Sequence, residues 1–327
     1  MDNLLPFEQI KRNVLVRRIA ETSEKYGKDP STRTVEELLK CGIINLDKSQ
    51  GPTSHQVSAY LQNVLNIKKA GHSGTLDPNV TGVLPVALNK ATKVVQTLLK
   101  AGKEYVCLMH LHRKVEEYDL YKAFGKFTGR INQLPPIKSN VVRQWRKRTI
   151  YYIEVLDFMD QDVLIRVGCE AGTYIRKLMH DIGQELKCGA HMAQLRRTKA
   201  GPFNETRLFS LNDVSDAFYY YKKHHNEKFI RQVIQPVEAA VRHLPKVWML
   251  DTSVDSICHG STLKVPGISK VEEKIEKGDL VALYTLKDEL VGFGEAKKTT
   301  KEMMGDKGVA VKTMKVVMEP GIYPTMS

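Results

Sequence analysis

The character of the chain changes at Leu244-Pro245. Before this point, helix-like and strand-like patterns alternate, whereas from Val247 onward short apolar segments are separated by single glycines. Short, closely spaced strands of this kind predict a compact β-barrel-like module. The glycines that punctuate it are Gly260, Gly267, Gly278, Gly292, Gly294, Gly305, Gly308 and Gly321. We therefore predict a larger domain over residues 41–245 and a small C-terminal β-barrel over residues 246–327.

Residues 1–40 lack a sustained apolar period and are strongly charged. They include a turn-forming sequence, KYGKDP, at residues 25–30. We expect an extended N-terminal arm with one or two short helices. Such an arm needs another surface to become ordered, and the C-terminal domain is the expected one.

The larger domain mixes both kinds of secondary structure. Strands are predicted at residues 42–46, 105–111, 141–143, 149–156 and 163–169. One helix is predicted to begin at Thr53 or Ser54 and to present Val57, Leu61 and Leu65 at helical spacing. Further helices are predicted at 91–100, 115–127, 174–186 and 229–242. This order predicts an α+β fold, with a mixed, largely antiparallel sheet flanked by helices.

The charge balance indicates a polyanionic partner. There are 50 Lys and Arg residues against 37 Asp and Glu, which gives a net charge of +13 and an isoelectric point near 9.3. Nucleic acid fits this excess best. A membrane surface is the alternative, but no apolar run approaches the length of a membrane span, and no signal-peptide pattern opens the chain. We expect a soluble, cytoplasmic protein with no membrane partner.

The cysteines and histidines give no metal signature. Five cysteines are scattered and odd in number, as expected of reduced thiols in a reducing compartment. The pairs His110-x-His112 and Cys258-His259 come nearest to metal ligands, but neither has a second pair at suitable spacing. We expect structural roles for both pairs and no metal site.

The octapeptide GHSGTLDP at residues 71–78 is the strongest candidate for chemistry. Its glycines suit a loop, and Pro78 pushes Asp77 toward an extended conformation that presents the carboxylate. An isolated Asp-Pro is usually only a turn, so the loop by itself leaves both interpretations open.

Four further segments resemble the motifs of one family in order and spacing. They are DKSQGPTS at 47–54, KEY at 103–105, GTYIR at 172–176 and LRR at 195–197. Together with the loop, they resemble the TruB/dyskerin family of RNA pseudouridine synthases, whose catalytic acid is Asp77 by this resemblance. The first motif departs from the family at Ser49, where a proline is usual, and Arg113 stands where glycine is frequent.

The resemblance implies that uridine in RNA is isomerised to pseudouridine without a cofactor. Asp77 is then a nucleophile toward the sugar or the base, or supports removal of a sugar proton, and the sequence does not choose among these routes. Arg176 is expected to pair with Asp77 and hold it ionised. Tyr105 is expected to stack on the target base, and Leu195 to keep the site dry.

Several residues are predicted to contact RNA. His72 is placed to fill the gap left by an extruded base, or is merely a loop histidine. The C-terminal module resembles a PUA domain, in which the His259-Gly260 turn lies near the RNA end. The other predicted contacts are Lys48, Arg143, Arg146, Lys147, Tyr174 and Arg196, and Arg197 next to Arg196 is a further candidate for the RNA groove.

The arm and the PUA pattern favour the archaeal and eukaryotic branch of the family, and an archaeal catalytic subunit in particular. This branch acts inside box H/ACA ribonucleoproteins, where a guide RNA selects uridines in ribosomal RNA. The implied partners are the guide RNA, substrate rRNA and tRNA, small Nop and Gar proteins, and a kink-turn-binding ribosomal-type protein. A stand-alone synthase for the tRNA T-loop and a non-catalytic RNA scaffold remain the alternatives.

Overall fold

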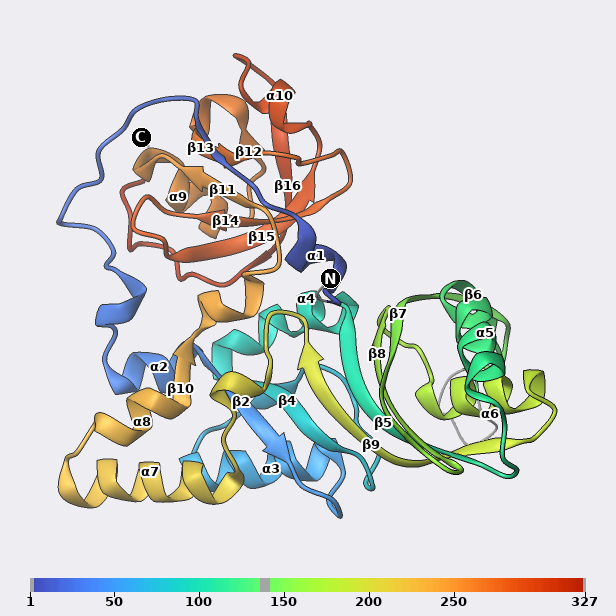
Figure 1. The fold of residues 1–327 in the computed structure, drawn as a ribbon. Coiled ribbons are helices and arrows are strands. Elements are labelled where there is room, and N and C mark those ends of the chain that lie inside the picture. The colour runs from blue at the N-terminus through green and yellow to red at the C-terminus, as the bar shows by residue number, and fades with distance from the viewer. Residues whose placement is uncertain (1–2, 136–141, 326–327) are drawn as a thin grey trace.

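The computed structural model describes residues 3–135 and 142–325. Two curled sheets, one above the other in Figure 1, organise this part of the chain. None of its helices is long and apolar enough to cross a membrane.

The larger sheet has nine strands in the order β10-β2-β4-β9-β5-β8-β7-β6, with β3 paired to β4. The neighbours run antiparallel except β4 and β9, which are parallel. Its strands are β2 (Gly42–Lys48), β3 (Ala70–His72), β4 (Thr81–Leu88), β5 (Lys103–Leu111), β6 (Gly129–Gln133), β7 (Arg146–Met159), β8 (Asp162–Cys169), β9 (Ala190–Ala200) and β10 (Ile234–Pro236). The predicted mixed, largely antiparallel sheet is confirmed.

Helices pack against this sheet in two groups. One group packs α3 (Ser54–Leu65), α7 (Leu211–His224) and α8 (Lys228–Val233) over the β2 and β4 half. The other packs α5 (Glu117–Phe127) and α6 (Ile175–Glu185) over β5 and β8, at the right of Figure 1. The remaining helices of this unit are α2 (Val35–Cys41), α4 (Val95–Lys100) and the 3₁₀ turns Pro30–Thr32, Asn89–Val94, Glu205–Arg207 and Val237–Val241.

The smaller sheet has the order β1-β13-β11-β14-β15-β16-β12. Its elements are β1 (Val14–Val16), β11 (Lys246–Met249), α9 (Asp251–Cys258), β12 (Leu263–Lys264), the 3₁₀ turn Val265–Gly267, β13 (Ile268–Glu272), β14 (Leu280–Tyr284), β15 (Leu290–Ala296), α10 (Thr300–Met303) and β16 (Val309–Val316). A buried cluster that includes Leu98, Trp248 and Phe293 joins the two units.

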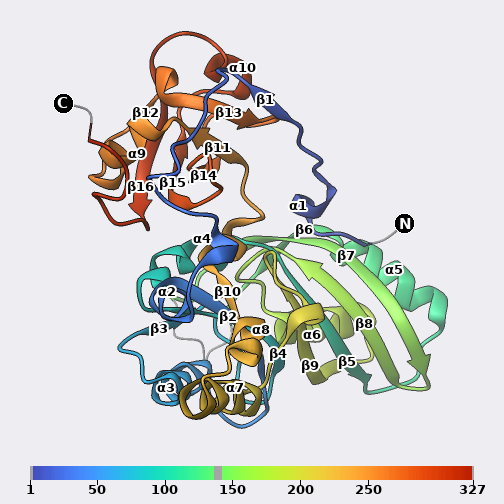
Figure 2. The same cartoon turned by 90° about the vertical axis from the view of Figure 1, so that its left-hand side faces the viewer.

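The N-terminal arm runs along the C-terminal unit. Its strand β1 pairs antiparallel with β13, with Leu15 opposite Val271, and Figure 2 shows the two side by side. Its short helix α1 (Pro6–Gln9) touches the larger unit instead, where Glu8 pairs with Lys199 at 3.1 Å. The arm therefore contacts both units.

Two predicted elements differ from the structure. The helix predicted over 229–242 is only α8, because Ile234 leaves the helix to pair with Ile44 of β2, and Pro236 cannot continue a helix. Of the strand predicted at 141–143, residues 142 and 143 are irregular, and residue 141 lies outside the described residues. Strand β7 begins only at Arg146.

Strands β4 and β9 were not anticipated from the sequence. Pro85 and Gly82 within β4 argue against a central strand, and β9 is rich in charged residues. Both strands are stabilised by pairing with strands that lie far away in the sequence, so no local pattern predicts them. Gly82 pairs in register with Arg197, and Tyr105 lies opposite Arg197 on the other side of β9.

Replacing Gly82 by alanine is expected to destabilise the protein by about 3 kcal/mol. Gly82 has φ +104°, and an added Cβ would lie 2.2 Å from the backbone oxygen of Arg197. The backbone of β9 cannot yield without breaking its ladder with β5. Thermal unfolding measures the effect.

Gly125 provides the matched control. It lies in α5, and no heavy atom comes within 4 Å of an added Cβ. Gly125→Ala is expected to be neutral or to stabilise by up to about 1 kcal/mol. Equal losses in both variants would contradict the proposed clash.

Candidate active site

The Asp77 loop connects β3 to β4 and is held from below by the end of β2 and the start of α3. The ammonium of Lys48 donates to the carbonyls of Pro78 at 3.1 Å and Val80 at 2.8 Å. The hydroxyl of Ser54 accepts from the Leu76 amide at 2.8 Å and donates to the Leu76 carbonyl at 3.1 Å. These contacts fix the backbone on both sides of Asp77.

Helix α3 begins where the sequence predicts. Thr53 is its N-cap and forms a capping box with Gln56. This leaves the buried Ser54 free to hold the loop, a role that sequence reasoning missed because its partner lies 22 residues away.

Asp77 and Arg176 form the predicted ion pair. Arg176 lies in the first turn of α6, and its Nη2 is 2.5 Å from Asp77 Oδ2. The two side chains are 55% and 58% exposed, so the pair is open to solvent. An RNA base that enters here would displace solvent from the ion pair. The attraction between the two charges would then be stronger, because the dielectric constant around them falls.

A pocket of about 640 Å³ opens at this ion pair. All four predicted catalytic residues, Asp77, Tyr105, Arg176 and Leu195, line it, as does Tyr174. They come from the loop, β5, α6 and β9, and the fold brings Asp77 together with Arg176, which is 99 residues away in the sequence. The pocket thus offers a carboxylate, an aromatic ring and an apolar wall to one ligand.

Two buried cations also line the pocket. Sequence reasoning proposed Arg197 for the RNA groove, beside Arg196, and assigned Lys103 no role. Arg197 is 1% exposed and Lys103 is 5% exposed. The Lys103 ammonium donates to the carbonyls of Leu98 and Ala101, each at 2.7 Å, at the end of α4. Burial lowers the pKa of Lys103 to about 7, and burial raises the pKa of Tyr105. The LRR and KEY motifs contain both cations, but only the fold shows that they point inward.

His72 lies at the end of β3 and meets His55 of α3 edge to face, with ring centroids 4.8 Å apart. Its Nδ1 accepts from the Gly74 amide at 3.4 Å. Burial, and then the neighbouring His55, lower the pKa of His72 to about 4. His72 is therefore a neutral ring at the edge of the loop at physiological pH.

The pKa of His72 leads to a pH prediction. Between about pH 6.5 and about pH 4, the unfolded chain binds a proton at His72 that the folded protein does not. Stability is therefore lost as the pH falls through this window. His72→Gln is expected to lose less of its melting temperature than the wild type across this range, by roughly 1–2 °C. If the melting temperatures of the two proteins fell in parallel as the pH was lowered, the lowered pKa of His72 would be refuted.

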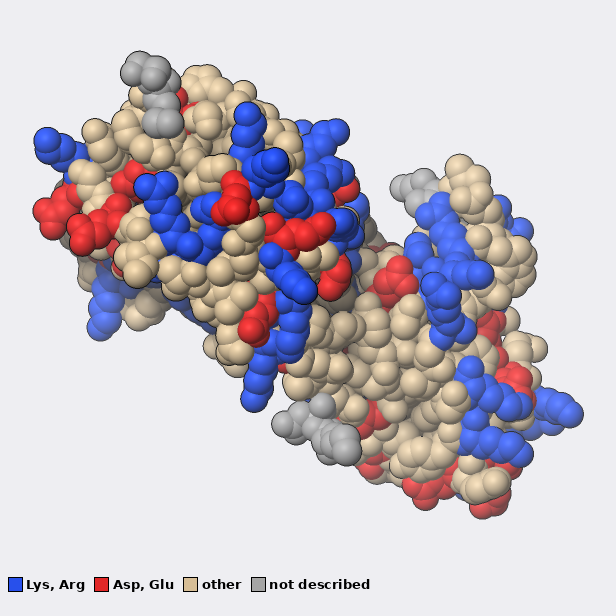
Figure 3. All heavy atoms as spheres, turned by 90° about the horizontal axis from the view of Figure 1, so that it is seen from above, with Lys and Arg blue, Asp and Glu red and all other residues tan. Residues whose placement is uncertain are grey.

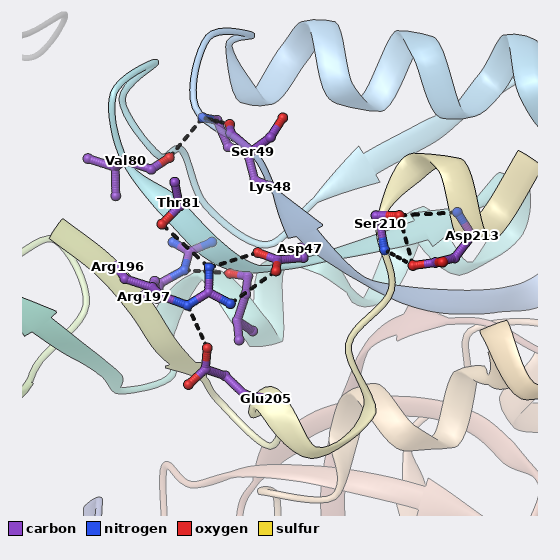
Figure 4. A network of polar contacts seen from close by, with 11 residues as sticks. Asp47, Lys48, Ser49, Val80, Thr81, Arg196, Arg197, Glu205, Ser210 and Asp213 are labelled. Carbon is purple, nitrogen blue, oxygen red and sulfur yellow. Dashed lines mark hydrogen bonds and ion pairs between the residues drawn. The ribbon is translucent and has the colours of Figure 1, made fainter.

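Arg196 and Lys48 were predicted to contact RNA, but their polar groups are engaged within the protein (Figure 4). The Arg196 guanidinium donates to both oxygens of Asp47 at 3.0 Å and to Glu205 at 2.6 Å. Lys48 is fully buried beneath the loop. Neither position offers an unpaired cation to a phosphate, because two carboxylates neutralise Arg196 and burial removes Lys48 from the surface.

The other predicted basic contacts lie at the start of β7. Arg143 and Lys147 are exposed, whereas Arg146 is half-buried and donates to the Val142 carbonyl at 3.4 Å. In Figure 3, Lys and Arg side chains gather over the C-terminal unit and again at the far end of the larger unit, on either side of a mostly uncharged stretch. The structure thus brings these residues to the surface but not into the pocket.

Tyr174 and the His259-Gly260 turn lie on different units. Tyr174 lines the pocket, and its backbone exchanges hydrogen bonds with the Gln133 side chain at 3.0 and 3.2 Å. His259 follows α9, and its Nδ1 lies 2.9 Å from the Asp255 carbonyl. Gly260 has φ +90° and open space around it. Its backbone is accessible to a ligand.

In the fold, His191 lies beside the pair His110 and His112. His112 Nε2 lies 3.0 Å from His191 Nδ1, and His110 Nδ1 lies 2.7 Å from Asp162. Within residues 3–135 and 142–325, however, no group of three or more His, Cys, Asp or Glu side chains could hold a metal ion.

Comparisons with known families agree with this architecture. Residues 62–175 match the N-terminal domain of TruB family pseudouridylate synthases, and residues 176–242 match the tRNA pseudouridylate synthase B C-terminal domain. Residues 4–58 match the DKCLD (NUC011) domain, and residues 245–317 match the PUA domain. The chain belongs to the TruB family and is an RNA pseudouridine synthase with a PUA domain.

Within that family, the chain is similar to archaeal proteins along its whole length. It is 52% identical to the "Probable tRNA pseudouridine synthase B" of Methanopyrus kandleri, over 99% of this chain and 96% of that protein. The protein of the same name from Pyrococcus furiosus is also 52% identical, with the same coverage.

The fold also resembles solved structures, including two that match this chain over almost its whole length. One is a crystal structure of a Cbf5-Nop10-Gar1 complex, with a TM-score of 0.95, 52% identity and 99% of each chain covered. The other is an H/ACA ribonucleoprotein bound to a substrate RNA containing 2′-deoxyuridine, with a TM-score of 0.92, 51% identity, and 98% of this chain and 99% of that chain covered.

Proposed function

We propose that this protein is the catalytic subunit of a box H/ACA ribonucleoprotein, in which a guide RNA selects the uridine. The likeness to Cbf5 carries this proposal, because it extends over 99% of both chains and includes the arm and the PUA domain. The proposed units are an arm (1–40), a catalytic domain (41–245) and an RNA-binding domain (246–327).

Asp77 is the proposed catalytic acid. Its loop is fixed by buried contacts, while its carboxylate stays open to a pocket large enough for a nucleobase. Arg176 keeps the carboxylate ionised and oriented through their ion pair. Tyr105 stacks on the extruded base, and Leu195 excludes water.

RNA is proposed to contact both units. His72 props the gap left by the extruded base, as an uncharged ring beside the loop. The His259-Gly260 turn binds the RNA end, which the open space at Gly260 supports. Arg143, Arg146, Lys147 and Tyr174 are assigned to the RNA groove. Lys48 and Arg196 instead act by supporting the site from within.

The proposed partners follow from the solved relatives. Nop10 and Gar1 accompany Cbf5 in one, and H/ACA RNA with a substrate accompanies another. We propose the same kinds of partner for this chain, together with a kink-turn-binding ribosomal-type protein. The archaeal relatives support a cytoplasmic location.

A stand-alone activity on the tRNA T-loop is the second candidate. The names of the archaeal relatives, probable tRNA pseudouridine synthase B, favour it. A non-catalytic scaffold is less consistent with an open pocket that holds the Asp77 and Arg176 pair. Guided and unguided activity are compatible in one protein.

The test measures pseudouridine in a guide-matched RNA and in a tRNA transcript, with the guide and partner proteins added singly and together. Product in the matched RNA that requires guide and partners is the expected result. Product confined to tRNA, regardless of guide, would favour the stand-alone enzyme. Guide-RNA binding with no product on either substrate would overturn both enzymatic proposals.

A further inference from the structure

Arg197 is a buried cation that lacks an acidic partner. Within the described parts of the chain it is the largest fully buried side chain, and its recorded hydrogen bonds go to backbone carbonyls, with no carboxylate in an ion pair. Its Nε donates to the Val83 carbonyl at 2.8 Å, and its Nη2 to the Gly74 carbonyl at 3.3 Å. Burying a charge without a counter-charge is costly, so its retention requires an explanation beyond the two carbonyls.

The guanidinium lies directly beneath the pocket. Arg197 is paired across the sheet with Tyr105, and both residues line the pocket. Burial lowers the pKa of Arg197, while the adjacent Tyr105 hydroxyl opposes this change. Gly74, which accepts one of its hydrogen bonds, belongs to the Asp77 loop. Arg197 thus contacts the loop and the tyrosine together.

The charges around the pocket do not balance. Its charged lining residues are Asp77, Lys103, Arg176 and Arg197. Asp77 and Arg176 neutralise each other in their ion pair. Burial lowers the pKa of Lys103 to about 7, so the excess positive charge at neutral pH lies mainly on Arg197. An empty pocket of this kind is electrostatically unsatisfied, and an anion would relieve it.

Uridine enters this pocket uncharged but becomes anionic during the reaction. When the bond between C1′ and N1 breaks, its electron pair stays on the base and spreads over N1, O2 and O4. If Asp77 adds to the base instead, the electrons likewise move into the ring. The base becomes neutral again when this electron pair forms the new bond from C5 to C1′, and removal of the C5 proton with protonation of N1 then completes pseudouridine. Negative charge on the base is therefore common to every route considered, and a preorganised cation favours it selectively.

We infer that Arg197 stabilises the negative charge that develops on the uracil base, in addition to holding the Asp77 loop. The inference rests on the proposed catalytic pocket. The competing explanation is purely structural: Arg197 then only ties the Gly74 and Val83 carbonyls together.

The two explanations differ in whether the effect of replacing Arg197 depends on how well the base itself stabilises negative charge. Fluorine at C5 withdraws electrons, so a 5-fluorouracil anion needs less stabilisation from the protein. We would measure single-turnover consumption of the target nucleotide, uridine or 5-fluorouridine, by the complete assembly with guide and partners. Arg197→Gln is expected to slow the consumption of uridine by about 100-fold but that of 5-fluorouridine by only about 10-fold. The ratio of the two rates does not depend on how much of the variant is folded.

Two further variants sharpen the test. Arg197→Lys retains the charge but not the planar fork, so it is expected to keep a rate ratio close to that of the wild type even if both rates fall. Arg166→Gln removes a guanidinium of the same sheet that pairs with Glu154 at 2.8 Å, and neither rate is expected to change.

Equal slowing of both substrates by Arg197→Gln would overturn the inference and leave the structural role. Failure of the proposed function is a distinct outcome, because the wild-type assembly would then convert neither substrate.

Discussion

Replacing Asp77 by asparagine is expected to abolish pseudouridine formation, with a loss of about 10⁴-fold or more. The amide has nearly the same shape, but it can neither attack as a carboxylate nor neutralise Arg176. The loop should keep its conformation, because Lys48 and Ser54 hold its backbone rather than its side chain. Product formation in a matched RNA measures the effect.

RNA binding and thermal unfolding are the controls for this variant. Asp77 is an exposed side chain, so its replacement should change the melting temperature little. Retained RNA affinity with no product would locate the defect in chemistry. Activity within about tenfold of the wild type would exclude Asp77 as the catalytic acid.

Lys48→Met is expected to destabilise the fold by about 3 kcal/mol and to reduce activity as well. The ammonium is fully buried and donates to three carbonyls, those of Ser49, Pro78 and Val80. Methionine fills the space but leaves these acceptors unpaired beside Asp77. Chemical denaturation measures the stability, and single-turnover kinetics measure the loss of activity.

Lys122→Met is the matched control, because Lys122 is an exposed lysine on α5. It should change stability by less than about 0.5 kcal/mol. If Lys48→Met changed stability as little as Lys122→Met, the loop would not depend on the buried ammonium of Lys48. If it lost only RNA affinity, the original prediction of a direct RNA contact would be favoured.

The residues that line the pocket were largely foreseeable. Asp77, Tyr105, Arg176 and Leu195 each belong to a short motif, and all four meet around one cavity. The fold class was equally accessible, because helical and alternating periods are visible locally. Their catalytic roles stay predictions until the variants are measured.

The sequence did not show which cations are buried or already paired within the protein. Lys48 and Arg196 read as surface cations for RNA, yet one is buried and the other is held by Asp47 and Glu205. Arg197 was likewise a candidate for the RNA groove, yet it is buried against the pocket. A charged side chain in a strand faces the core or the solvent according to the register of its neighbours, and that register depends on distant segments.

The sequence by itself determined the family, the fold class and four of the residues that line the pocket, because these depend on short runs of residues. Only the tertiary structure decided that β4 and β9 are central strands, that Ile234 pairs with β2 instead of extending a helix, and that Lys103 and Arg197 are buried at the pocket. The reason is physical: strand pairing and burial are interactions between segments far apart in the chain, and their energies are absent from any local pattern.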